Sequence, residues 1–324
     1  MSDRERDEHA ALDRQQASIA ALERGELPLA ARERIDELRQ KGAAWTSDLS
    51  VGEMAAVRHA GFEPVGMVMG SGVFRIAAQW GYLSNYGAGG SSGGRVRTYP
   101  CPHGFGYGMG GMVGVGMASS EHRAGYNWEH TNYEAGIAGA RDAALSRILA
   151  EASDIGAHGV VGVRIIRRHL EGVGSSLEFT CIGTAIRRAG GPKLRTPFMS
   201  HLDGVAFSKL IHGGYVPVAL VMGIGAMEID PGCGTEWQLR SWSNVRIPQV
   251  SDGLEEARML GINRLEGEIA SVDADGAVGV ETDFNAHELG GEAMLVELFL
   301  LGTAVRRFAK EPLDEPPLPI LRLR

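Results

Sequence analysis

An internal repeat constrains the fold of this chain more than any other feature of its sequence. Residues 49–70 read LSVGEMAAVRHAGFEPVGMVMG, and residues 202–223, which begin 153 positions later, read LDGVAFSKLIHGGYVPVALVMG. Leu, His, Gly, Pro and the closing Val-Met-Gly recur in register. Self-similarity over this length predicts that the chain contains the same folding unit twice.

The later parts of the repeat have a shorter offset. Residues 159–163, GVVGV, match residues 276–280, GAVGV, 117 positions later, and a Gly-Thr-Ala-x-Arg-Arg block at 183–188 recurs 119 positions later. The difference between offsets of 153 and 117 gives the first unit 36 additional residues. We place them in a glycine-rich insertion at residues 81–132.

A long helix is the strongest structural prediction in each unit. Apolar or small residues recur every three or four positions over 137–155, and the same spacing is found over 254–272, which predicts a helix with one buried face. Small residues at Ala140 and Ala144, and at Ala257 and Gly261, predict a close approach of each helix to its sheet.

Short β-branched segments around this helix predict strands. One follows a proline in each unit, at 65–69 and 218–222, and a hairpin follows the helix, with glycine turns near 172–174 and 290–291. The fold class is therefore α+β, with two tandem α-β-α-β-β units. Each unit has a long helix packed on a small antiparallel sheet, and an N-terminal helical segment precedes them.

The predicted organisation of the chain has five parts. In chain order these are an N-terminal helical arm at 1–46, a first unit at 47–188, a linker at 189–198, a second unit at 199–308 and a proline-rich tail at 309–324. The arm is charged and rich in Ala and Leu, so we expect it to cap the fold or bind a protein partner.

Composition excludes several classes of protein. A formal net charge of −8 and a pI near 5.7 argue against a nucleic-acid partner, because such binding depends on lysine and arginine. No apolar run has the length of a membrane span, and the N-terminus lacks the apolar region of a signal peptide, so we expect a cytoplasmic protein. Three cysteines without CxxC spacing suggest neither a disulfide framework nor a zinc ribbon.

The insertion holds the best candidates for metal ligands. Thiolate, thioether and imidazole donors are concentrated there, a set that suits zinc or copper. The candidate ligands are Cys101, His103, His122 and His130. Their spacing is irregular, and the favoured alternative is a glycine-rich flap whose methionines and aromatics pack on the sheet or on a neighbouring subunit.

Several polar residues recur at related positions in the two units. His59 matches His212, His169 and His287 both precede a hairpin turn, and Arg141 matches Arg258. Ligand binding is one interpretation of the histidines, although a histidine in the last turn of a helix also interacts favourably with the helix dipole. For the arginines, a bridge between subunits is favoured over anion binding.

Acidic pairs are also present in the second long helix. Glu255/Glu256 and Glu266/Glu268 are interpreted as residues of its solvated face. They are not counted among the candidate functional residues.

The motifs of the first unit resemble those of the YbjQ-like family. They are Tyr133-Glu134, Ala140-Arg141, Gly156-Ala157, the block 159–163 and the block SLEFTCIGTA at 176–185. Family members have a similar Gly-Ala-x-Ala-Val-Val-Gly and a hairpin closing on Ser-Gly-Thr-Ala-Val. The second unit keeps Ala257-Arg258 and the Gly-Thr-Ala-Val at 302–305, so the resemblance covers roughly 48–188 and 201–308.

The resemblance implies architecture more than activity. It implies a small α/β unit with an antiparallel sheet, assembly into rings that are commonly of five units, and a heavy-metal-binding label. Two units per chain would allow five chains to supply ten units, or one unit to form the ring while the other decorates it. We therefore expect a homo-oligomeric binding or scaffold protein, with a metal or small ligand; the alternative is an enzyme whose site uses the repeated histidines at a subunit interface.

Overall fold

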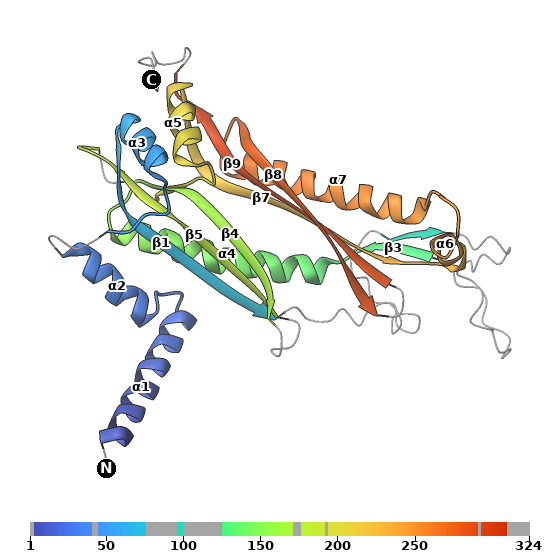
Figure 1. The fold of residues 1–324 in the computed structure, drawn as a ribbon, viewed down its shortest axis with the longest axis horizontal. Coiled ribbons are helices and arrows are strands. Elements are labelled where there is room, and N and C mark those ends of the chain that lie inside the picture. The colour runs from blue at the N-terminus through green and yellow to red at the C-terminus, as the bar shows by residue number, and fades with distance from the viewer. Residues whose placement is uncertain are drawn as a thin grey trace, which may run out of the picture.

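A computed structural model shows that the chain is built from two units with the same order of elements (Figure 1). The structure describes residues 3–40, 45–75, 96–99, 125–170, 176–191, 194–290 and 293–309. Unit 1 consists of α3 (Val51–His59), β1 (Phe62–Arg75), α4 (Thr131–Asp154), β4 (Gly159–Leu170) and β5 (Ser176–Arg188). Unit 2 consists of α5 (Gly204–His212), β7 (Tyr215–Asp230), α7 (Pro248–Ser271), β8 (Gly276–Gly290) and β9 (Ala293–Arg307).

The remaining elements lie outside this repeated order. They are α1 (Asp3–Glu23), α2 (Leu29–Arg39), β2 (Val96–Tyr99), β3 (Gly125–Glu129), β6 (Phe198–Met199) and α6 (Cys233–Leu239). Helix α1 projects away from the two sheets, whereas α2 lies beside unit 1 (Figure 1). In the part of the chain that the structure describes, no helix has the length and apolar character needed to cross a membrane.

The predicted α-β-α-β-β order is confirmed, and each unit forms one sheet. Sheet 1 has the strand order β1-β5-β4-β6 and sheet 2 has the order β2-β3-β7-β9-β8. The pairings are antiparallel apart from β4 with β6. Two further strands are not predicted by the repeat. Strand β3 extends the sheet of unit 2 by pairing with β7, and β6 extends the sheet of unit 1 by pairing with β4.

Local signals in the sequence position the short helices. Ser50 and Glu53 form a capping box at the start of α3, and Asp203 caps α5 by accepting a hydrogen bond from the Ala206 N–H at 2.7 Å. Helix α3 ends before Gly61 and α5 before Gly214, and both glycines have a positive φ. Each unit therefore enters its first strand through the same turn.

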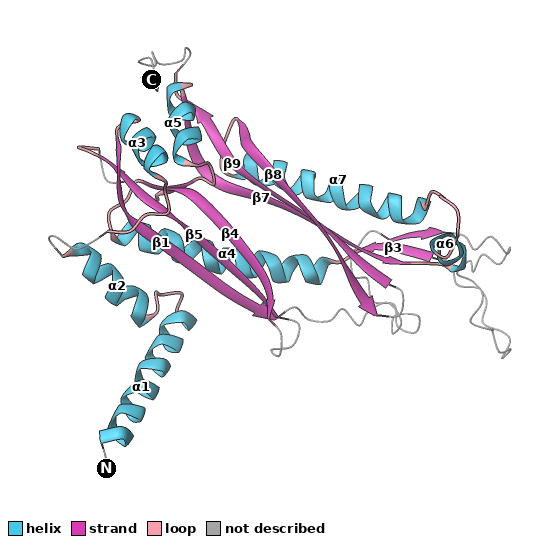
Figure 2. Ribbon diagram, in the orientation of Figure 1, coloured by secondary structure: helices cyan, strands magenta, loops and turns pink. Residues whose placement is uncertain are grey.

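Each long helix lies along the strands of its own sheet (Figure 2), and the contacts in the two units occur at equivalent positions. A Cβ atom at Gly70 would lie 2.1 Å from the carbonyl oxygen of Ala144, and one at its counterpart Gly223 would lie 2.1 Å from that of Gly261. One turn earlier in α7, a Cβ atom at Gly225 would lie 1.9 Å from the carbonyl oxygen of Ala257. Backbone therefore meets backbone at both crossings, and only glycine on the strand leaves room for the helix. The predicted close approach through small residues is confirmed.

Both faces of sheet 2 are covered, but by different parts of the chain. Val221, Leu298 and Leu300 pack with Leu265 of α7 on one face. The opposite face contributes to the large core cluster of unit 1. Its members on that face are Leu220, Met222, Ile224, Ala226, Leu295, Phe299 and Leu301. The contact between this face of sheet 2 and unit 1 is called the seam below.

Candidate functional site

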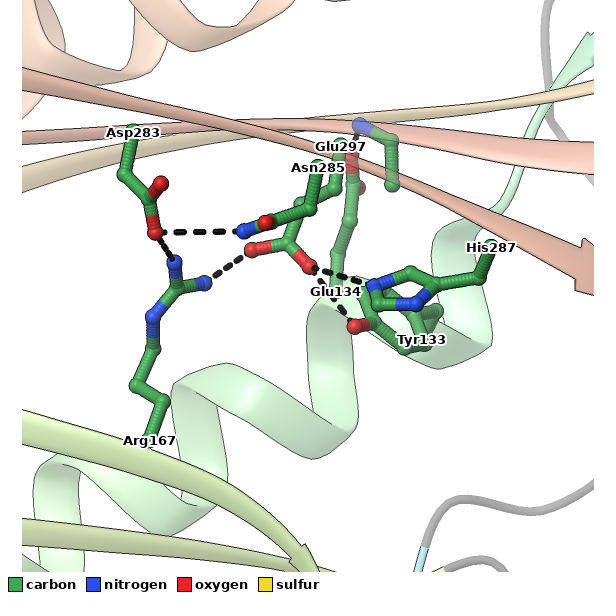
Figure 3. Close-up of polar contacts among 8 residues, drawn as sticks. Tyr133, Glu134, Arg167, Asp283, Asn285, His287 and Glu297 are labelled. Atoms are coloured by element: carbon green, nitrogen blue, oxygen red, sulfur yellow. Dashed lines mark hydrogen bonds and ion pairs between the residues drawn. The ribbon is translucent and has the colours of Figure 1, made fainter.

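A buried carboxylate marks the centre of the seam (Figure 3). Glu297 of β9 has a side chain that is only 2% exposed. Its Oε2 accepts a hydrogen bond from the Tyr133 hydroxyl at 2.7 Å, and His287 Nε2 lies 4.0 Å from the same oxygen. Burial and the charge of Glu297 raise the pKa of Tyr133, so this hydroxyl remains a proton donor.

Arg167 of β4 brings a positive charge from unit 1 to this carboxylate. Its guanidinium donates to Glu297 and to Asp283, and its Cζ lies 4.1 Å from the centroid of the Phe299 ring. Asn285 donates a hydrogen bond to Asp283 at 3.1 Å and so helps to hold Asp283, the more exposed of the two carboxylate partners of Arg167. An arginine held by carboxylates and an aromatic face joins the units with fixed geometry.

A second polar cluster surrounds Arg264 of α7. Its guanidinium donates to Glu134 and to Glu129, the latter at 2.6 Å, and to the Ile224 carbonyl oxygen at 2.6 Å. Glu134 also accepts the Ala226 N–H at 3.1 Å. Burial raises the pKa of Glu134 to about 7, although Arg264 and the Ala226 N–H act in the opposite direction.

His130 and Glu228 lie next to this cluster. The His130 ring stacks on Trp128 with centroids 5.7 Å apart, and its Nε2 lies 3.8 Å from Glu228 Oε2. Burial lowers the pKa of His130, while burial and the nearby Asp230 raise the pKa of Glu228 to about 7. Two carboxyl groups whose pKa is raised to about 7 by burial, Glu134 and Glu228, therefore lie close together near the contact between the units.

Helix carboxylates satisfy the free edges of both long strands. Glu151 of α4 accepts the Met69 N–H at 2.9 Å, and Glu268 of α7 accepts the Met222 N–H at 2.7 Å. The interpretation of Glu268 as a solvated residue is therefore wrong. Its carboxylate replaces a strand partner that the edge of β7 lacks at this position, because a buried N–H needs an acceptor.

Of the four predicted metal ligands, His130 alone lies within the described residues. Cys101, His103 and His122 lie outside the described residues. His130 caps α4, because its Nδ1 accepts the Tyr133 N–H at 3.2 Å. Within the described ranges, no group of three or more His, Cys, Asp or Glu residues is arranged to hold a metal ion. The described residues therefore do not form a metal site by themselves.

The repeated histidines lie at two distant places. His59 and His212 stack on each other with centroids 5.3 Å apart, where α3 packs on α5. His287 lies near Glu297 at the other end of sheet 2. It pairs with Leu295 near the start of β9, whereas the start of β7, which follows α5, pairs with Arg307 at the end of β9. His169 is in β4, opposite Leu177 of β5. The side chains of His59 and His212 therefore do not converge with that of His287 on one point.

The repeated arginines have different surroundings. Arg141 donates to Glu268 at 2.5 Å and thereby links α4 of unit 1 to α7 of unit 2. Arg258, its counterpart, is exposed, and within the described ranges it pairs with Glu255 of its own helix alone, at 3.3 Å. The same residue type thus faces a partner unit in one repeat and solvent in the other.

The cysteines contribute no exposed nucleophile among the described residues. Cys181 is a buried free thiol in β5, and burial raises its pKa to about 12. Cys233 at the start of α6 is disulfide-bonded. The cysteine spacing suggested no disulfide framework, so the sequence did not predict this bond at Cys233.

Sequence reasoning missed Glu297 and Arg167, the two residues that define the seam. A signal for Glu297 is present, because it is the one charged residue in the apolar strand AMLVELFLLGTAV. A charge inside such a strand needs a buried partner. The identity of that partner depends on the packing of the units and is not encoded near Glu297 in the sequence.

The fold and the seam define an α+β protein with two tandem units, and comparison with known proteins places it further. The family described as "Putative heavy-metal-binding" matches residues 123–189, which include α4, β4 and β5. The encapsulin nanocompartment protein Rv1762c of Mycobacterium tuberculosis (strain ATCC 25618 / H37Rv) is 31% identical over 277 residues, covering 84% of this chain and 89% of that protein. The chain belongs to the family of that protein.

Proposed function

We propose that this protein is a self-assembling scaffold of the kind that the name of its relative describes, a component of a protein nanocompartment in the cytoplasm. In this proposal unit 2 is a second YbjQ-like copy, and the chain binds other copies of itself rather than catalysing a reaction. The support for it is a surface that occurs in both units. It is buried in unit 1 and exposed to solvent in unit 2.

The open surface lies on unit 2, along α7 and β8. Val163 of β4 is 2% exposed in the seam, whereas its counterpart Val280 of β8 is 46% exposed. Leu145 of α4 packs against the core cluster that joins the units, whereas its counterpart Ile262 of α7 is 41% exposed. Equivalent positions thus bury apolar surface in unit 1 and present it to solvent in unit 2, which favours a protein partner.

The edge of sheet 2 has the same asymmetry. In unit 1, β6 pairs with the edge of β4 at Gly159 and Val160, and the Ser200 N–H continues the pairing to the Val160 carbonyl oxygen at 2.9 Å. In unit 2, β8 is the last strand of the described sheet. Residues 45–46 lie 153 positions before β6 and are therefore its counterpart in the repeat. We propose that residues 45–46 of a second copy pair with β8, as β6 pairs with β4.

We expect the purified protein to form complexes heavier than the single-chain mass of 34.6 kDa. Ile262→Asp should shift these complexes toward the monomer, because a charge would be buried at the contact. Met259→Asp is the matched control, since Met259 is equally exposed on α7 but its counterpart, Asp142, is exposed in unit 1. Light scattering coupled to size exclusion measures the masses, and a wild-type monomer at every concentration would contradict the proposal.

We also propose that zinc or copper binds at the insertion, through His103, His122 and His130. The description of the matching family as "Putative heavy-metal-binding" supports this second proposal, and the matched residues 123–189 include His130. We expect elemental analysis after growth with zinc and copper to find metal in the wild type and none after deletion of residues 81–132. A wild-type protein without metal would contradict it.

A further inference from the structure

Three helices of this chain share a short pattern in which an arginine is followed four residues later by leucine or isoleucine. The pairs are Arg34/Leu38 in α2, Arg141/Leu145 in α4 and Arg258/Ile262 in α7. Residues four apart lie on the same side of a helix. Each helix therefore presents one cation and one aliphatic side chain together.

In α4 this pattern engages unit 2 at a defined carboxylate. Arg141 donates to Glu268 at 2.5 Å, and the other oxygen of Glu268 accepts the Met222 N–H. Glu268 is held between the free edge of β7 and its own helix, so its position is fixed before an arginine arrives. This is the site through which unit 2 receives the long helix of unit 1.

The equivalent site on unit 1 is occupied by α2. Glu151 precedes Glu268 by 117 positions and accepts the Met69 N–H, as Glu268 accepts the Met222 N–H. The Arg34 guanidinium donates to this Glu151 carboxylate and to the Met67 carbonyl oxygen at 2.9 Å. Leu38 lies 3.5 Å from the position of a Cβ atom on Gly66.

The third copy of the pattern has no such site within the described chain. Arg258 and Glu255 are both more than half exposed, at 56% and 65%, so their ion pair contributes little. The chain thus has one receiving carboxylate on unit 1, covered by a short helix, and one outward-facing arginine on unit 2.

We infer that the surface of unit 1 under α2 is the receiving surface for α7 of a second copy, and that α2 occupies it in the single chain. Arg258 of the second copy takes the place of Arg34 at Glu151. This inference rests on the proposed self-assembly and adds that assembly requires α2 to leave.

The size of α2 is consistent with a replaceable occupant. It spans only 11 residues, and Ile35 is its one buried residue. A helix of this length is marginal in water without tertiary contacts. By contrast, α7 spans 24 residues, so the long helix of another copy can extend along more of this surface than α2 does.

Arg34→Glu in the full-length chain tests this inference, because it places a second carboxylate beside Glu151 and releases α2. We expect the concentration at which half of the chains are assembled to fall about tenfold, since losing α2 removes a competitor. Arg32→Glu is the matched control on α2, because Arg32 pairs with the exposed Glu26 and not with unit 1. Adding Arg258→Glu to Arg34→Glu should cancel the gain.

Hydrogen exchange gives an independent readout on the wild type. Amides of residues 29–39 should lose protection as the protein concentration rises and complexes form. If complexes form while α2 stays protected and Arg34→Glu does not strengthen assembly, the inference is wrong and the scaffold proposal stands. If neither the wild type nor Arg34→Glu assembles at any concentration, the scaffold proposal itself fails.

Discussion

Replacing Glu297 by alanine is expected to lower the free energy of unfolding by about 3 kcal/mol. The change leaves the Tyr133 hydroxyl without its acceptor and removes the buried partner of Arg167, whose side chain is only 14% exposed. We expect the lower end of the range for a broken buried pair, because Asp283 still accepts from Arg167. Equilibrium unfolding in urea measures the change.

Glu178→Ala is the matched control for this prediction. Glu178 occupies the position in β5 that Glu297 occupies in β9, but it is half-buried and accepts only the Thr180 hydroxyl, at 3.1 Å, among the bonds described. Its removal should cost at most about 1 kcal/mol. Similar losses for the two variants would show that the seam does not depend on the buried carboxylate.

Gly225→Ala is expected to destabilise the protein by about 3 kcal/mol, the upper end of the cost of overpacking. The new Cβ would lie 1.9 Å from the Ala257 carbonyl oxygen, and backbone cannot move aside as a side chain can. Helix α7 would have to lift from β7, which also disturbs Arg264 and its two carboxylate partners. Thermal unfolding followed by circular dichroism should show a lower midpoint.

Gly267→Ala provides the opposite expectation within the same helix. A Cβ at Gly267 meets nothing within 4 Å, and alanine favours a helix over glycine by about 1 kcal/mol. This variant should therefore be slightly more stable than the wild type. An unchanged stability of Gly225→Ala would rule out the close crossing of α7 and β7, whereas a loss of stability in Gly267→Ala would contradict the open surroundings of Gly267.

Much of the fold follows from the sequence because it depends on local chemistry repeated twice. The spacing of apolar residues predicts α4 and α7, and the small residues of each helix predict the crossings at Gly70 and Gly225. The capping pattern at Ser50 and Glu53 predicts the start of α3. These signals lie within a few residues of the structure that they determine.

The polar site was predictable only in part. His287 was singled out by its place before a hairpin turn, and the structure puts it beside Glu297. Arg167, which joins the units, carried no signal, because its counterpart in unit 2 is Phe284 and the repeat therefore conceals it. A contact between positions 130 residues apart cannot be read from spacing along one chain.

The sequence by itself determined that one α-β-α-β-β unit occurs twice and where each helix meets its sheet. Only the tertiary structure decided which copy of each repeated residue is buried. Arg141 meets Glu268 while Arg258 faces solvent, because unit 1 packs on the side of unit 2 where Glu268 lies. Equivalent residues differ in environment since the environment is supplied by the other unit, whose position depends on packing across the seam.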